Sequence, residues 1–473
     1  MKNLPLLALA FISSTVLAQK TKQDVFKSID SKGDQYANVA HRIWEFAEVG
    51  YQEVKSSALL QETLTEAGFK IEKGVAGIPT SFVASYGSGK PVIAILAEFD
   101  ALPGVSQDAV PEVKPVPGRT AGHACGHHLF GTASSAAAIA VKEWMIANKK
   151  TGTIRVYGTP TEEGGSGKVY MVRDGLFNDV DIVLHWHPGA INDARTSESL
   201  ANKSGKFRFH GIASHAAGSP DRGRSALDGV EAMDNMVNMM REHVPSDTRI
   251  HYVITRGGEA PNVVPAFAEV YYYVRHPDKS QVISIWDRVV KAAEGAALGT
   301  ETKMDFELTG GVYNLLANTI LAKTMNDNLR LVGGYTLSDK EKEFAQKIQK
   351  TFTAPPRLEE TNVIHEFGED GDMMGSTDVG DVSWVVPTTG LSTATWVPGT
   401  AAHSWQAVAA GGMSIGNKGM MMAAKTLAAT AIDLFEQPAL VQEAWKEFNS
   451  RRPQNFKYEA LVGDRKPALD YRK

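Results

Sequence analysis

The sequence predicts an α/β protein with a mixed, mainly parallel sheet and helices on both faces, interrupted by an inserted ferredoxin-like α+β domain. Short apolar runs alternate with helical segments over the first 200 residues, a pattern typical of a parallel sheet. Strands and helices then follow in the order β-α-β-β-α-β, and the α/β pattern resumes near residue 315. The expected parts are a signal peptide (1–18), a catalytic domain in two pieces (19–200 and 313–473) and a lid or dimerisation domain (201–312).

The first piece of the catalytic domain contains two helical segments and a series of short strands. Apolar positions recur with helical spacing in Gln23–Phe46, and Ser56–Ala67 is a second helix that ends at Gly68. Pro91–Ala97 is a continuous apolar run of the kind buried on both faces of a sheet. Further strands are expected at Ser81–Tyr86, Thr153–Tyr157 and Asp181–Leu184, and an alanine-rich helix at Gly131–Ile146.

The hydrophobic pattern of the chain changes after about residue 200. Gly205–Gly211 alternates like a half-exposed strand, and Gly223–His243 is an amphipathic helix that ends before Pro245. The lid is completed by strands at Ile250–Thr255, Phe267–Arg275 and Lys303–Thr309 and a helix at Gln281–Ala297. The returning catalytic part is expected to contain strands at Trp384–Val386 and Ala394–Val397 and a closing helix at Asn417–Phe435.

The N-terminus has the pattern of a secretory signal peptide. Lys2 supplies a positive charge, Leu4–Phe11 is a short apolar core, and Val16–Ala18 resembles a small-residue cleavage site. The apolar stretch is too short to span a bilayer, and the alternative is a disordered or core segment. We therefore expect a periplasmic or secreted protein. Because no later run reaches 18 apolar residues, we expect no membrane span.

Bulk composition gives no indication of a polyanionic partner. The chain is 43% hydrophobic and 22% charged, with a net charge of −5, which gives no sign of a nucleic-acid partner. Cys125 is the only cysteine, so an intramolecular disulfide is impossible. This residue is a buried apolar filler, a free thiol or a metal ligand, and His123 and His127 two residues away favour the ligand.

Ionisable side chains follow four predicted strands, at the point where each strand ends. Glu98 and Asp100 follow one apolar run, the pair Glu162 and Glu163 follows another, and histidines come after the last two runs. In open α/β sheets, ligands bind at the carboxyl ends of the strands. The sequence therefore predicts one site at this edge.

The residue types at this edge indicate a metal-dependent hydrolase. Cys125 and His127 lie in a glycine-containing loop, and thiolate, imidazole and carboxylate groups are ligands that Zn²⁺ accepts, whereas Mn²⁺ prefers oxygen. Adjacent acids are usually solvated, but these lie between a buried strand and a glycine-rich turn. We expect Glu163 to bind metal and Glu162 to act as the general base.

Histidines after the next strand complete the candidate set. His185 and His187 flank Trp186, and His185 is preferred as the ligand because it follows the apolar run directly. His215 lies in the inserted domain, where its ordinary role is that of a satisfied surface histidine. Arg224, at a helix start, is a candidate to hold a substrate carboxylate, although a structural salt bridge is its more ordinary role.

Seven segments occur in a characteristic order: AEFDALPG, GHACGHH, TPTEEGGSGK, LHWHP, GIASHAAGSP, GGEAPNVVP and AAHSW. Together they resemble the M20 metallopeptidases, and specifically their amidohydrolase branch, along nearly all of the chain after the signal peptide. The resemblance implies a catalytic domain interrupted by a lid that mediates dimerisation. It also implies a homodimer, or a heterodimer with a sister subunit.

The resemblance further implies a dinuclear site that holds two divalent ions, Zn²⁺ or Mn²⁺. The implied ligands are Cys125, His127, Glu163, His185 and His403. Many relatives carry an acid after the second of these, where this chain has His128, so the surroundings of the ligands can differ.

Four other residues receive roles from the same resemblance. Glu162 resembles the general base, and His215 resembles a lid histidine that polarises the scissile carbonyl, in related dimers from the opposite subunit. Asn262 resembles a lid residue near the substrate carboxylate, and Asp100 resembles an aspartate that supports the site.

The resulting hypothesis is a metal-dependent amidohydrolase that acts on N-acyl- or aminobenzoyl-amino acids. Two alternatives remain. One is a metallo-carboxypeptidase or dipeptidase of the same superfamily, and the other is a non-catalytic accessory subunit. A complete ligand set together with Glu162 argues against the last, because a binding protein has no use for a general base.

Overall fold

The computed structural model describes residues 22–194, 196, 199–368 and 375–472. The expected signal peptide at 1–18 lies outside these described residues. Within them, no helix combines the length and apolar character that crossing a bilayer requires.

A six-stranded mixed sheet forms the centre of the catalytic domain, in the order β1-β2-β6-β3-β7-β12. The last four strands in this order are parallel to one another, while β1 and β2 form an antiparallel edge. The strands are β1 (Lys70–Lys73), β2 (Phe82–Ser88), β3 (Val92–Ala97), β6 (Gly152–Gly158), β7 (Ile182–Gly189) and β12 (Thr388–Ala394), beside a small pair, β4 (Leu102–Pro103) and β5 (Ala121–Gly122).

Helices cover both faces of this sheet. Every residue of β3 is buried, so neither face of the central strand meets solvent, as expected for a parallel sheet between helical layers. Two long helices, α4 (His127–Ala147) and α13 (Ser414–Glu436), pack against one another in the main core. The other helices of this domain include α2 (Gly33–Phe46), α3 (Val54–Glu66), α5 (Glu162–Gly165), α6 (Gly167–Arg173), α9 (Thr319–Val332), α10 (Asp339–Gln349), α11 (Val379–Ser383), α12 (Trp405–Gly411) and α14 (Pro438–Arg451).

The returning strands differ from the sequence prediction. Trp384–Val386 is not a strand, because the N–H groups of Val385 and Val386 both donate to the carbonyl of Val382 and continue the turn of α11. Pro387 then ends this turn, since it has no N–H to donate. Among the described residues of the returning part, the strand that joins the sheet is β12, which ends at Ala394, where the second predicted strand was expected to begin.

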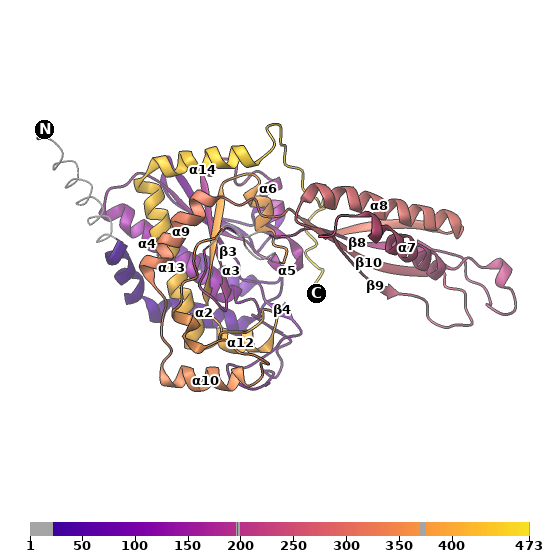
Figure 1. Cartoon of the computed structure of the whole chain (residues 1–473), viewed down its shortest axis with the longest axis horizontal. Coiled ribbons are helices and arrows are strands. Elements are labelled where there is room, and N and C mark those ends of the chain that lie inside the picture. The colour runs from indigo at the N-terminus through magenta and orange to yellow at the C-terminus, as the bar shows by residue number, and fades with distance from the viewer. Residues whose placement is uncertain (1–21, 195, 197–198, 369–374, 473) are drawn as a thin grey trace, which may run out of the picture.

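The inserted domain has the predicted ferredoxin-like order. Its antiparallel sheet runs β11-β8-β10-β9, and one apolar core joins the sheet to its two helices. Figure 1 shows this domain projecting from the side of the catalytic domain next to α5. Its elements are β8 (Ala201–His210), α7 (Ala226–Met240), β9 (Arg249–Arg256), β10 (Phe267–His276), α8 (Lys279–Gly299) and β11 (Lys303–Val312).

Candidate metal centre

The carboxyl ends of the parallel strands bring the candidate ligands to one edge of the sheet. Glu98 and Asp100 follow β3, Glu162 and Glu163 follow β6, and His187 lies near the end of β7. Cys125 and His127 enter from the start of α4, and His403 from the loop after β12. These segments are far apart in the chain, and the parallel strands together with the start of α4 and the loop after β12 make them neighbours.

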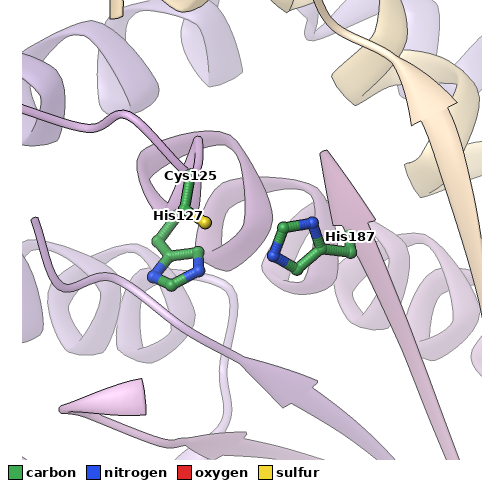
Figure 2. Close-up of side chains that lie close together, drawn as sticks. All are labelled: Cys125, His127 and His187. Atoms are coloured by element: carbon green, nitrogen blue, oxygen red, sulfur yellow. The ribbon is translucent and has the colours of Figure 1, made fainter. Parts of the chain in front are cut away.

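Two groups of metal-binding atoms share one thiol. Cys125, His127 and His187 form the first group, and Cys125, Glu163 and His403 form the second, with the donor atoms of each group within 4.8 Å of one another. Figure 2 shows the side chains of the first group, with the rings of the two histidines turned toward each other. A shared thiolate between two neighbouring groups is an arrangement suited to a pair of cations.

Buried polar atoms that lack hydrogen-bond partners indicate whether these residues fit a cation. His127 Nε2 lies 3.1 Å from a Glu98 oxygen, yet among the described residues neither this nitrogen nor Glu163 Oε1 has a well-formed hydrogen bond. Buried polar atoms without partners are costly, so their convergence indicates that a ligand completes them. The donor set of sulfur, imidazole and carboxylate therefore fits a divalent transition-metal ion.

Asp100 connects the two donor groups. Its Oδ1 lies 2.8 Å from His127 Nδ1, and its Oδ2 accepts a hydrogen bond of 2.9 Å from the N–H of Glu163. Burial alone would raise the pKa of Asp100, but the charge of His127 and its hydrogen bond lower it. When the ring of His127 is neutral and donates its Nδ1–H to Asp100, the Nε2 lone pair is left for a metal, the usual arrangement around ligating histidines.

The two adjacent acids point to different neighbours. Glu163 Oε1 lies 3.4 Å from His403 Nε2, whereas the carboxylate of Glu162 belongs to a third group, with Glu98 and His127. The two residues follow left-handed backbone at Thr161 (φ 63°), and Glu163 itself has non-helical dihedrals (φ −71°, ψ 63°).

Burial and neighbouring charges shift the pKa values of the two carboxyl groups in opposite directions. Burial raises the pKa of Glu162 well above its usual range, and the negative charges of Glu98 and Glu163 raise it further. Burial also acts to raise the pKa of Glu163, but the polar contact with the His403 ring and the charge of His127 bring it below its usual value. Glu163 is therefore suited to ligation as a carboxylate, and Glu162 is the carboxyl group of the pair that holds a proton more tightly.

The structure places His187, rather than the predicted His185, among the metal-binding groups. Both histidines are partly buried, and their side chains extend from the same side of β7, because strand side chains alternate. The ring of His185 packs against β12, where a Cβ on Gly390 would lie 2.3 Å from it. The prediction took the first histidine after the apolar run, but β7 continues to Gly189, so the second is nearer the edge.

The other histidines around Cys125 have backbone partners. His123 Nε2 lies 3.0 Å from the carbonyl of Ile43, and His128 Nε2 lies 3.1 Å from that of Gly411. Burial lowers the pKa of His123 to about 3, so this ring is neutral. Both therefore attach the loop and the start of α4 to surrounding segments.

Sequence reasoning missed a buried ion network beside the site. Lys168 Nζ lies 2.6 Å from Glu98 Oε1 and 2.7 Å from Asp378 Oδ1, with all three side chains at most 2% exposed. Lys168 follows the acidic pair closely in the sequence, which was an available signal. Asp378 lies more than 200 residues away, and nothing in the sequence around it indicated this contact.

The predicted lid residues lie apart from both donor groups, in the inserted domain. The backbone of His215 forms an isolated antiparallel β-bridge with Val263, and the carbonyl of Asn262 accepts a hydrogen bond from the N–H of Ala216. Arg224 Nε bonds to Glu301 at 2.5 Å, which is the structural salt bridge considered for it. Their roles toward a substrate stay predictions.

The chain is similar to known hydrolases and peptidases. A model of the peptidase dimerisation domain (M20_dimer) matches residues 201–301. A subunit of the p-aminobenzoyl-glutamate hydrolase of Escherichia coli (strain K12) is 42% identical, covering 90% of this chain and 95% of that relative. Xaa-Arg dipeptidase of Mus musculus is 28% identical, covering 93% and 94%. A solved M20-family dinuclear metal-binding peptidase of Bacillus subtilis superimposes with a TM-score of 0.58 at 16% identity, covering 86% of this chain and 99% of that one.

Proposed function

Because the chain belongs to the M20 family of metallopeptidases and amidohydrolases, it is a hydrolase of amide bonds, and we propose that it releases an amino acid with a free carboxylate from an N-acyl or aminobenzoyl amide. The observation that carries this proposal is the pair of donor groups sharing Cys125, with the partly buried acid Glu162 beside them. The Escherichia coli relative, named for hydrolysis of p-aminobenzoyl-glutamate, supports the substrate class.

The metal centre is proposed to hold two divalent cations, Zn²⁺ or Mn²⁺. His127 and His187 would hold one, Glu163 and His403 the other, and Cys125 both. When bound, such a pair supplies Lewis acidity toward the carbonyl and lowers the pKa of water. Burial raises the pKa of the Cys125 thiol, so a bound cation is needed to keep it as a thiolate.

Glu162 is the proposed general base. Its raised pKa lets it take a proton from the attacking water and return that proton to the leaving amine nitrogen. Because its carboxylate lies with Glu98 and His127, outside the two groups that share Cys125, it remains available for this transfer.

The variant Glu162→Gln tests this assignment. We expect it to retain two metal ions per chain and to lose about 10²–10⁴-fold in kcat, the usual range for general acid–base catalysis. Metal content by elemental analysis and hydrolysis of p-aminobenzoyl-glutamate are measured on the same preparation. Full activity in this variant would remove the general-base role.

His215 is proposed to stabilise the developing oxyanion. Its Nδ1 accepts hydrogen bonds from the N–H groups of Ala217 and Gly218, at 3.2 and 3.0 Å, so the proton of the neutral ring is on Nε2. A fixed N–H donor is what such a role requires. The expected result of His215→Ala is a fall in kcat of about 10²–10³-fold with metal content unchanged.

The lid domain is proposed to form the dimer through β9. This strand lies at the edge of its sheet, and Tyr252, Val253 and Ile254 on it are exposed. An exposed apolar edge strand is a template for pairing with another chain. Val253→Lys should shift the protein to monomers in sedimentation experiments, whereas Leu298→Lys, at an exposed position on α8, should not.

A wild-type protein that is monomeric alone would instead favour pairing with a sister subunit, since the Escherichia coli relative is named as one subunit of its enzyme. The proposed export through residues 1–18 is tested by cell fractionation and by N-terminal sequencing of the mature protein. Recovery of an uncleaved protein from the cytoplasm would contradict it.

A dipeptidase is the second candidate, because the mouse Xaa-Arg dipeptidase is similar over 93% of this chain. The two functions differ in the group on the carbonyl side of the scissile bond, which is an acyl or aminobenzoyl group in one and an aminoacyl residue in the other. Parallel kcat/KM measurements on acyl-amino acids and Xaa-Arg dipeptides separate them. Preference for the dipeptides would replace the first proposal.

A further inference from the structure

The segment after α14, residues 452–472, returns to the metal centre. Tyr471 Oη and Arg472 Nη2 both donate to the backbone carbonyl of Glu163, at 3.1 and 2.9 Å. Figure 1 shows the C-terminal end of the chain beneath α5, which contains Glu163. Neither residue takes part in the chemistry proposed above, and both lie more than 300 residues away from Glu163 in the sequence.

The segment is attached along its course. Tyr458 Oη donates to Asp381 at 2.7 Å, and Gln52 donates to the carbonyl of Leu469 at 2.9 Å. Arg465 contacts the lid strand β11, through the carbonyl of Thr309 at 2.8 Å and the carboxylate of Glu307 at 3.0 Å. These contacts bring residues 471 and 472 to the site in a defined position.

The backbone around Glu163 needs such support. Glu163 has non-helical dihedrals (φ −71°, ψ 63°), and the following Gly164 is left-handed (φ 98°). The N–H of Glu163 donates a hydrogen bond to Asp100, and the C=O of Glu163 accepts hydrogen bonds from Tyr471 and Arg472. Both backbone polar groups of Glu163 are therefore satisfied by side chains from distant segments. The charged donor, Arg472, makes the stronger type of hydrogen bond.

The surroundings of Tyr471 are shaped for it. Its ring packs edge-on against Tyr51, with centroids 5.6 Å apart, and Tyr51 Oη donates to the carbonyl of Gly165 at 2.8 Å. A Cβ on Gly50 would lie 2.9 Å from Tyr471 Oη, so a glycine leaves room for the hydroxyl. Two tyrosines thus hold neighbouring carbonyls of the same turn.

We propose that Tyr471 and Arg472 are positioning residues of the metal centre. By fixing the carbonyl of Glu163, they orient its carboxylate for the cation held with Cys125 and His403. The other group is supported by Asp100 and the start of α4 and does not depend on them. This inference rests on the proposed metal centre and adds a role for the C-terminal segment within it.

The test is a calorimetric titration of the metal-free, full-length protein with Zn²⁺. The double variant Tyr471→Phe/Arg472→Ala removes both hydrogen bonds to the carbonyl of Glu163. We expect one of its two Zn²⁺-binding steps to weaken about tenfold, which is part of the energy of two hydrogen bonds, and the other step to change less than about twofold. Replacing Arg472 by lysine instead of alanine keeps a cationic donor and should recover most of the loss. Asp470→Ala, at an exposed neighbouring position, is the matched control and should leave both steps unchanged.

The outcomes separate this inference from the proposed function. Two unchanged steps in the double variant would overturn the positioning role while leaving the metal centre intact. Equal weakening of both steps would also overturn it, because that result indicates a general loss of structure. A wild-type protein that binds no Zn²⁺ would remove the metal centre itself.

Discussion

Replacing Lys168 by methionine should destabilise the catalytic domain strongly. The Lys168 ammonium lies between Glu98 and Asp378, with contacts of 2.6 and 2.7 Å and no exposure to solvent. Burial acts to lower the pKa of Lys168, yet the two carboxylates hold it well above its usual range. The methionine would leave two buried acids close together with no cation between them.

The expected loss in the free energy of unfolding follows from this geometry. Removing one partner of a buried ion pair costs about 3–5 kcal/mol, because the remaining charge is uncompensated. Native proteins are stable by only about 5–15 kcal/mol, so this change would remove a large fraction of that stability. Adding Asp378→Asn to Lys168→Met removes one of the two stranded charges and should restore about 1–3 kcal/mol, within the range of coupling between contacting residues.

Urea unfolding of the metal-free protein is the assay, because bound metal would add its own stabilisation. Lys168→Met and Asp378→Asn are measured singly and together. A loss below about 1 kcal/mol in Lys168→Met would refute the reasoning, since it would mean that solvent or protonation compensates Glu98 and Asp378. Purely additive effects would refute the proposed coupling between the two residues.

Three further predictions concern the site and the core. His187→Ala should lose one metal ion in a Zn²⁺ titration, whereas His185→Ala should keep both; the reverse result would restore His185 as the ligand. Asp100→Asn should weaken both binding steps about 10–100-fold, because one carboxylate supports both donor groups; an effect on a single step would contradict this. Burial acts to raise the pKa of Glu341, but hydrogen bonds from Lys418 and neighbouring groups lower it to about 2. The stability from Glu341 is therefore present above its ordinary pKa of 4.5 and is lost as pH falls toward 2, so Glu341→Gln should cost about 2–3 kcal/mol at pH 7 in urea unfolding and progressively less below pH 4.5.

Strand ends could be predicted from the sequence because buried strands have a strong apolar signal. Pro91–Ala97 and Thr153–Tyr157 correspond to β3 and β6, and the acids that follow them do reach one edge. Trp384–Val386 carried the same apolar signal but forms a turn, since a short apolar run does not by itself distinguish a strand from a buried helical turn.

Other contacts had no local signal. His185 and His187 share one side of β7, so periodicity alone could not choose between them, and it is the length of the strand that brings His187 beside Cys125 and His127. Asp378 and Arg472 reach the site through the tertiary fold. Contacts of this kind follow from the path of the chain between elements, which residue periodicity does not encode.

The buried lysine also bears on which of the three donor groups holds a cation. Glu98 Oε1 is already paired with the Lys168 ammonium at 2.6 Å, so a metal ion bound by Glu98, His127 and Glu162 would be placed close to a fixed positive charge. In the two groups that share Cys125, the acid is Glu163, whose ion-pair partner among the described residues is His403 and whose Oε1 lacks a well-formed hydrogen bond. This arrangement supports the proposal that the cations are held at Cys125 and that Glu162, on the side of the lysine, transfers the proton.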